Sequence, residues 1–288
     1  MSTALKRTSL KTYLDFVKFE HTLFALPFAY GGMLLAERSW PGWTTFLWIT
    51  LAMIGARTAS MALNRVIDAE IDAKNPRTAS REIPSGRLSK QNGIVLALVG
   101  FVLFGLAGWA LNPLTFALLP VAVFFLTLYP YTKRFTWLCH YWLGLSIGAA
   151  AAGGWIAVTG RFDSAAYFLW AGVALWIAGF DIIYAILDKG FDQTNGIQSI
   201  PARFGEKKAL HISAISHVLA WLSLGIVMPL SGSGTPYALG LVAVGIVLWF
   251  AHYLVRTKGA GAALASFNAN LYVSSLMLVS IIADIWLN

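Results

Sequence analysis

The sequence has 288 residues, of which 58% are hydrophobic and 12% are charged, and its formal net charge is +8. Soluble domains carry about 25% charged residues, so the composition excludes an ordinary soluble protein and predicts an integral membrane protein. The single cysteine, Cys139, excludes an internal disulfide, a Cys-rich zinc site and an iron–sulfur cluster.

Nine apolar segments are long enough to form membrane-spanning helices, each of which needs about 20 residues. We therefore expect an all-α integral membrane protein with nine transmembrane helices. The expected spans are 20–37, 43–67, 91–110, 113–130, 138–159, 165–188, 208–230, 235–254 and 264–286. The first twenty residues lack the continuous apolar stretch of a cleavable signal peptide, and we expect none.

Lys and Arg are divided unequally between the two sides of the membrane that nine helices would create. With the N-terminus inside, 18 of the 21 fall in cytoplasmic segments, Arg38 and Arg161 fall in the opposite loops, and Arg57 lies within a helix. Basic loops face the cytoplasm, so we expect a multi-pass protein of the cell (inner) membrane, with the N-terminus cytoplasmic and the C-terminus on the opposite side. Topology thus accounts for the positive charge, and we expect membrane lipid, not nucleic acid, as a partner.

The second span ends in the stretch NRVIDAEID, which carries a regular polar pattern. Asn64, Asp68 and Asp72 recur every four residues, so they share one face of a helix. Arg57, seven residues before Asn64, lies on the same face. Acidic residues at a helix end are usually only solvated. This pattern indicates a functional site because the sixth span carries a second, matching acidic pattern.

The second pattern lies in the sixth span, within GFDIIYAILDKGFD. Asp181, Tyr184, Asp188 and Asp192 are offset by 0, 3, 7 and 11 residues, which again places them on one helical face. An ionisable group inside a span, such as Asp181, normally faces a cavity. The second and sixth spans are four apart in order, so both acidic clusters would face the same side. Each is followed by a basic loop that contains Ile-Pro, a pattern typical of a parallel repeat.

Oxygen ligands without a cysteine cluster or a His pair suit a hard divalent cation such as Mg²⁺. Carboxylates alone would repel a diphosphate, but a bound metal reverses the sign of the local charge. Basic residues that would complete the neutralisation lie in the inner loops: Arg77, Arg81, Lys133, Arg134 and Arg203. We therefore predict a Mg²⁺–diphosphate site where a central cavity of the bundle opens to the cytoplasmic side. The apolar interior would hold the substrate's tail, which indicates an isoprenyl diphosphate.

These motifs resemble those of the UbiA superfamily of intramembrane prenyltransferases. NRVIDAEID matches the family's NxxxDxxxD, the elements RTASR and PSG follow it, YAILDKGFD matches the second motif, and a YPYTKR phrase follows the fourth span. The likeness covers essentially the whole chain and implies one domain over residues 1–288 with nine helices. Two positions depart from the pattern. Glu82 stands where many members have Pro, and Lys189 lies inside the second motif, where several carry another acid.

The resemblance implies roles for the residues of these motifs. The Mg²⁺ ligands would be Asn64, Asp68 and Asp72 for one ion and Asp188 and Asp192 for a second. The diphosphate would be bound by Arg77, Arg81, Tyr129, Lys133, Arg134 and Arg203. Arg57 and Tyr184 would line the cavity where the acceptor enters and would complete the catalytic set with the four motif aspartates.

The opening stretch VKFEHTLFALPFAYGG resembles bacterial members that prenylate an aromatic acid, such as 4-hydroxybenzoate or a dihydroxynaphthoate. Lys18 and His21, with Arg57 and Asp181, would bind this acceptor. The implied reaction is Mg²⁺-dependent transfer of an isoprenyl chain from a polyprenyl diphosphate through an allylic carbocation. Two alternatives stay open: a family member that acts on haem or forms lipid ethers, and an ion-coupled transporter with intramembrane acids.

Overall fold

The computed structural model describes the backbone of residues 10–287, with the side chains of residues 11–18 and 25–287. Within this part of the chain, all regular structure is helical. The elements are α1 (Leu10–Phe16), α2 (Phe19–Glu37), α3 (Trp43–Ile67), α4 (Ala69–Lys74), α5 (Lys90–Leu111), α6 (Pro113–Thr132), α7 (Cys139–Thr159), α8 (Ser164–Tyr184), the 3₁₀ turn η1 (Ala185–Asp188), α9 (Lys189–Asn195), α10 (Ile200–Leu230), α11 (Thr235–Lys258), the 3₁₀ turn η2 (Ala260–Ala262) and α12 (Ala263–Leu287).

Among the described residues, eight helical segments are long and apolar enough to cross a membrane: α3, α5, α6, α7, α8 through α9, α10, α11, and η2 with α12. They correspond to the second to ninth expected spans, so the chain is an all-helical, multi-pass membrane protein. α2 covers the first expected span, but the side chains of residues 19–24 lie outside the described part, and the count of nine stays a prediction. α10 begins at Ile200 rather than at residue 208, because it includes a short helix before the expected span. The two parts are separated by a kink at Gly205, where φ is 77°.

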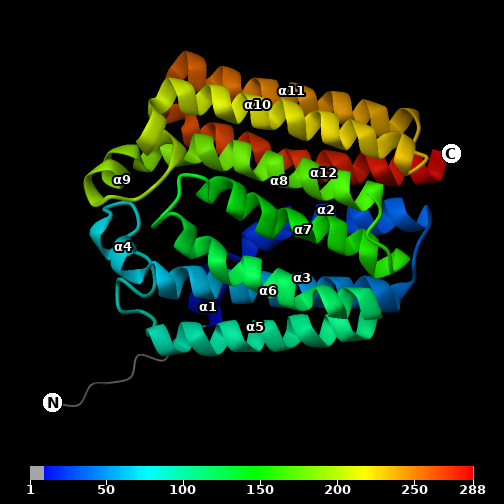
Figure 1. The fold of residues 1–288 in the computed structure, drawn as a ribbon, viewed down its shortest axis with the longest axis horizontal. Coiled ribbons are helices and arrows are strands. Elements are labelled where there is room, and N and C mark those ends of the chain that lie inside the picture. Colours follow the sequence, from blue (N-terminus) through cyan, green and yellow to red (C-terminus); the bar gives the residue numbers. More distant parts are fainter. Residues whose placement is uncertain (1–9, 288) are drawn as a thin grey trace.

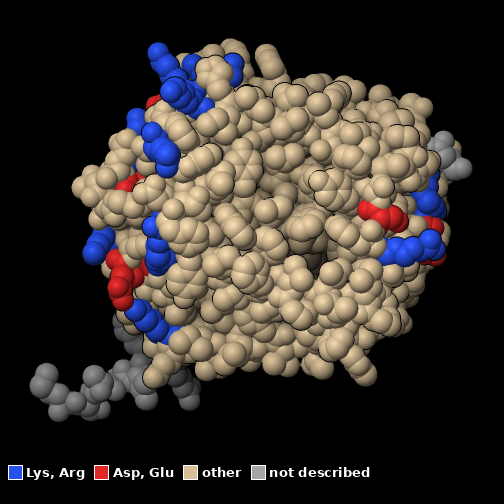
Figure 2. Space-filling model, in the orientation of Figure 1, with Lys and Arg blue, Asp and Glu red and all other residues tan. Residues whose placement is uncertain are grey.

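The long helices run side by side between two ends of the molecule, and α4 and α9 lie together at one of them (Figure 1). We call this the motif end, formed by residues 68–90, 132–138 and 185–200. α12 finishes at the opposite end. Charged side chains gather at these two ends, and the broad band between them is almost free of charge on the face shown in Figure 2. An exposed apolar band of this kind suits contact with lipid.

Glycine and alanine allow α2 and α7 to approach closely. A Cβ atom added at Gly154 would lie 1.9 Å from the carbonyl oxygen of Ala29, and one at Gly32 would lie 2.1 Å from that of Ala151. Small residues at a crossing let two membrane helices pack with their backbones in contact. The main core lies against this pair, where Phe28 and Trp176 pack with their ring centroids 5.1 Å apart.

Both acidic motifs lie where a long helix changes direction, and not on one continuous helix as expected. Asp68 separates α3 from α4 with φ −89° and ψ 0°. The backbone N–H groups of Asp68 and Asp72 still donate to the residues four earlier, at 2.9 and 2.8 Å, so the shared face continues through the junction. In the second motif, the 3₁₀ turn η1 lies between Tyr184 and α9, and Asp188 is its last residue.

Candidate active site

Asp68 is the centre of the first acidic cluster. Its Oδ2 accepts hydrogen bonds from Asn64 Nδ2 at 3.0 Å and from Lys133 Nζ at 2.6 Å. Its Oδ1 is buried and accepts no hydrogen bond among the described residues, although Arg134 Nη1 lies 3.3 Å away. Lys133 and Arg134, at the end of α6, thus place two positive charges beside Asp68, although Lys133 lies 65 residues later in the chain.

Asp72 is buried in the same cluster and pairs with a different base. Arg81 Nη1 donates to both of its carboxylate oxygens at 2.7 Å. Glu82 is also buried, but it pairs with Arg87 at 3.3 Å and not with the residues of the motif. The unusual acid at position 82 therefore contributes to the loop's own ion pairs.

The loop after the first motif reaches the second motif directly. Asn75 Nδ2 donates to Asp188 Oδ1 at 3.0 Å, and Arg77 donates to both oxygens of Asp188, with Nε 2.8 Å from Oδ1. Arg77 Nη1 also donates to the Tyr184 hydroxyl at 3.0 Å. Burial lowers the pKa of Arg77, but the hydrogen bond and charge of Asp188 outweigh it and hold this pKa above its ordinary value. The two clusters therefore meet at the motif end.

Asp181 and Asp192 have partners of another kind. Asp192 is buried, and its Oδ2 accepts a hydrogen bond from Ser199 Oγ at 2.8 Å. Asp181 Oδ2 lies 2.7 Å from Nδ1 of His140, the second residue of α7. Nε2 of this buried histidine accepts a hydrogen bond from the backbone N–H of Ile200 at 3.2 Å. A backbone N–H only donates, so the ring proton is on Nδ1 and is donated to Asp181.

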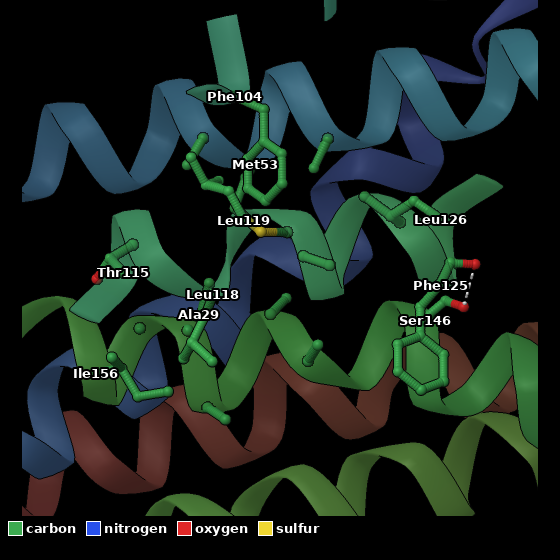
Figure 3. Close-up of a pocket in the computed structure, with 18 of the residues that line it drawn as sticks. Ala29, Met53, Phe104, Thr115, Leu118, Leu119, Phe125, Leu126, Ser146 and Ile156 are labelled. Carbon is green, nitrogen blue, oxygen red and sulfur yellow. Dashed lines mark hydrogen bonds between the residues drawn. The ribbon is translucent and has the colours of Figure 1, made fainter. Parts of the chain in front are cut away.

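An apolar cavity of about 340 Å³ lies among α3, α6 and α7, with contributions from α2, α5 and α8. Figure 3 shows side chains of these helices, including Met53, Phe104 and Leu119, around the space. The molecular surface is hollowed over this part of the bundle in Figure 2. Arg57 and Ser60 line the cavity on the face of α3 that continues to Asn64. The cavity therefore leads along this helix toward the first acidic cluster.

Residues 25–276 match the model of the UbiA prenyltransferase family. The chain belongs to this family. It is 28% identical to the 4-hydroxybenzoate octaprenyltransferase of Vibrio atlanticus (strain LGP32), over 97% of this chain and 99% of that protein. The protein of the same name from Herminiimonas arsenicoxydans is 29% identical, over 87% and 88% of the two chains. As a member of the UbiA family, the protein is a prenyltransferase.

Solved structures confirm the UbiA fold of the chain. The apo structure of a UbiA homolog from Aeropyrum pernix K1 has a TM-score of 0.85 at 32% identity, covering 92% of this chain and 98% of that chain. A UbiA homolog from Archaeoglobus fulgidus bound to GPP and Mg²⁺ has the same fold, with a TM-score of 0.67 at 16% identity, over 96% and 99% of the two chains.

The UbiA-family site gathers most of the residues predicted from the sequence, but Arg203 stands apart. Arg203 is exposed, with its Cζ 5.7 Å from the ring centroid of Trp137, and no contact among the described residues joins it to an acidic cluster. Lys18 precedes α2 in a left-handed backbone conformation, with φ 48°. The side chain of His21 lies outside the described residues. Tyr129, in contrast, is buried near the end of α6, close enough to Arg57 and Asp68 to interact with their charges.

Sequence reasoning missed His140 and Asn75. A histidine at the start of the fifth expected span looks like an interfacial residue, and its partner Asp181 is 41 residues away. Asn75 follows the first motif directly, but its bond to Asp188 crosses 113 residues. The polar composition of the loop after Asp72 indicated that Asn75 could belong to the site. Nothing in the sequence indicates the partner of His140.

The residues of the UbiA-family motifs fit Mg²⁺ by their chemistry, although the ligands are not assembled for it. In the described part of the chain, no three His, Cys, Asp or Glu side chains converge as a metal site, and bases pair with several of the motif carboxylates. The donor set nevertheless consists of carboxylate and amide oxygens, which a hard cation prefers. Asp68 Oδ1, which is buried, accepts no hydrogen bond among the described residues and lies 3.3 Å from Arg134 Nη1, would be an acceptor for such an ion.

Proposed function

We propose that this enzyme transfers an isoprenyl chain from a polyprenyl diphosphate to an aromatic quinone precursor of the 4-hydroxybenzoate or dihydroxynaphthoate type. One observation carries the proposal: a charged, oxygen-rich cluster and an apolar cavity follow one another along α3. A diphosphate head and a hydrocarbon tail would each meet a surface of matching polarity. The relatives named 4-hydroxybenzoate octaprenyltransferase support the acceptor class.

In this proposal, the motif residues hold the diphosphate through metal and base together. The Mg²⁺ ligands are Asn64, Asp68, Asp72, Asp188 and Asp192. Bound Mg²⁺ supplies Lewis-acid neutralisation of the departing diphosphate. Arg77, Arg81 and Lys133, which pair with carboxylates in this structure, would donate to the diphosphate oxygens, with Arg134 and Tyr129 near them. Arg203 remains a further candidate for diphosphate binding.

Bond breaking precedes bond making in the proposed reaction. The bond between the first prenyl carbon and the diphosphate oxygen breaks, and its electron pair leaves with the diphosphate. A ring carbon of the acceptor then attacks the allylic carbocation, and the ring loses a proton. The apolar wall of the cavity keeps water away from the cation.

We assign Arg57 to the carboxylate of the aromatic acceptor. It is buried on the cavity wall, and its Nε has no hydrogen-bond partner among the described residues. A bound carboxylate would satisfy this donor and neutralise the charge. Tyr184 lines the acceptor's path, and Lys18, His21 and Asp181 remain further candidates for acceptor binding.

We also propose that the motif end faces the cytoplasm, in the cell (inner) membrane. The support is the distribution of basic residues, since the loops at this end hold eight of the 21 Lys and Arg, whereas the loops at the opposite end hold only Arg38 and Arg161. The soluble aromatic acid and the diphosphate head would then reach the site from the compartment in which water-soluble metabolites are made.

An acceptor panel tests the proposed function. Purified protein in detergent, with Mg²⁺ and a polyprenyl diphosphate, is given 4-hydroxybenzoate, a dihydroxynaphthoate, haem or a glycerol phosphate lipid precursor. We expect prenylated aromatic product and stoichiometric release of pyrophosphate, both abolished by EDTA. A prenylated product only with haem or the glycerol compound would overturn the acceptor class, and activity in EDTA would overturn the metal requirement.

A further inference from the structure

His140 links two helices at the motif end and is not one of the family's motif residues. It is 3% exposed. Its neutral imidazole donates from Nδ1 to Asp181 on α8 at 2.7 Å and accepts at Nε2 from the N–H of Ile200, the first residue of α10, at 3.2 Å. The ring therefore fixes the beginning of α10 against α7 and α8.

The turn that His140 holds is also the one that holds Asp192. Ser199 caps α10 by accepting from the backbone N–H of Ala202 at 3.3 Å, and the same hydroxyl donates to Asp192 Oδ2 at 2.8 Å. Gln198, the preceding residue, donates its backbone N–H to the carbonyl oxygen of Lys133 at 2.7 Å. The position of Asp192 thus depends on the turn at residues 198–200. This turn is hydrogen-bonded to Lys133 before α7 and to His140 within α7.

We propose that His140 is a positioning residue for Asp192, and that Asp181 fixes the orientation and tautomer of His140. The inference rests on the proposed function, in which Asp192 is a Mg²⁺ ligand. His140 itself touches neither metal nor substrate. It acts through Ile200 and Ser199, so that Asp192 needs little reorganisation when the metal binds. Partners that orient metal ligands in this way typically change metal affinity by about 10- to 100-fold.

Three variants separate positioning from general packing. His140→Leu removes both hydrogen bonds, whereas His140→Gln keeps an amide that can accept from Ile200 and donate to Asp181. His211→Leu is the matched control, because His211 is exposed on α10 and contacts the carbonyl oxygen of Lys207. The measurement is Mn²⁺ binding to the purified protein with inorganic pyrophosphate, followed by electron paramagnetic resonance, alongside the thermal unfolding midpoint.

We expect His140→Leu to weaken Mn²⁺ binding about 10- to 100-fold, His140→Gln to recover most of the affinity, and His211→Leu to match the wild type. In turnover assays, His140→Leu should raise the Mg²⁺ concentration for half-maximal rate while the unfolding midpoint stays near that of the wild type. A merely structural role would lower the unfolding midpoint together with the turnover at saturating Mg²⁺.

The outcomes distinguish this inference from the proposed function. If the wild type does not bind Mn²⁺ with pyrophosphate, both are overturned. If the wild type binds and His140→Leu binds equally well, the positioning role alone is overturned. Should His140→Leu fail to fold, Ser199→Ala breaks only the last link to Asp192, and unchanged Mn²⁺ affinity in that variant would equally overturn the inference.

Discussion

Asp68 is almost fully enclosed, with 1% of its surface exposed, and two cations lie against its carboxylate. Asp68→Asn keeps the size of the side chain and removes its charge. Because a bound metal supplies several kcal/mol of charge stabilisation in the transition state, we expect kcat to fall by about 100-fold or more. Turnover with Mg²⁺ and a polyprenyl diphosphate measures the effect.

Glu70→Gln is the control for Asp68→Asn. Glu70 lies two residues further along, is exposed, and pairs with Lys90 at 3.1 Å on the surface. Exposed ion pairs of this kind contribute little to stability, so the control should fold and turn over like the wild type. Near-normal activity in Asp68→Asn would contradict the metal assignment.

Substitution of Arg57 should have opposite effects on stability and on activity. It is a buried cation, 9% exposed, and its Nε has no hydrogen-bond partner among the described residues. An unsatisfied buried donor costs about 1–3 kcal/mol, so Arg57→Met should raise the thermal unfolding midpoint while it lowers turnover of the aromatic acid. A variant that loses both stability and activity would show that Arg57 holds the helices together instead.

At the scale of elements, the α2–α7 crossing predicts a strong contrast between neighbouring glycines. Gly154→Ala would place a Cβ 1.9 Å from the Ala29 carbonyl oxygen, whereas the Cβ of Gly153→Ala meets nothing within 4 Å. Overpacking costs typically about 1–3 kcal/mol, and alanine favours a helix over glycine by about 1 kcal/mol. Gly154→Ala should therefore lower the unfolding midpoint, and Gly153→Ala should keep or raise it. Equal midpoints would contradict the described crossing.

Hydropathy predicted the long helices closely but not the backbone within the motifs. The turns at Asp68 and at η1 were missed because a pattern of period 3.6 assumes one continuous helix. The same pattern correctly indicated that Asp68 and Asp72 share a face, since the hydrogen bonds of the helix continue through the junction.

The side-chain partners were beyond sequence reasoning for a different reason. The pairing of Asp181 with His140 was not predicted, and the expected role of Asp181 in acceptor binding stays a prediction. Arg77 was expected near a diphosphate, and in this structure it holds Asp188. Such pairs depend on how helices far apart in sequence are packed, and periodicity within one helix contains no information on that.

At the scale of the whole molecule, the motif end and the α7–α8 turn should lie on opposite sides of the membrane. Ser85, in the loop after the first motif, and Ser164, at the start of α8, are both exposed. In a Cys139→Ser background, Ser85→Cys and Ser164→Cys should react with a membrane-impermeant maleimide from opposite faces of oriented vesicles. Labelling of both from one side would contradict the proposed topology.

At the motif end, three bases neutralise three of the acidic side chains. If the proposed site residues are right, Arg81 would turn from Asp72 to the diphosphate and leave a carboxylate for the cation, and a cation on Asp72 would release Arg81 in the same way. The pairs of Lys133 with Asp68 and of Arg77 with Asp188 would exchange in the same way. By linkage, each ligand then raises the affinity for the other by the same factor. The enzyme would thus capture a metal–diphosphate complex and leave free Mg²⁺ and uncomplexed anions largely unbound.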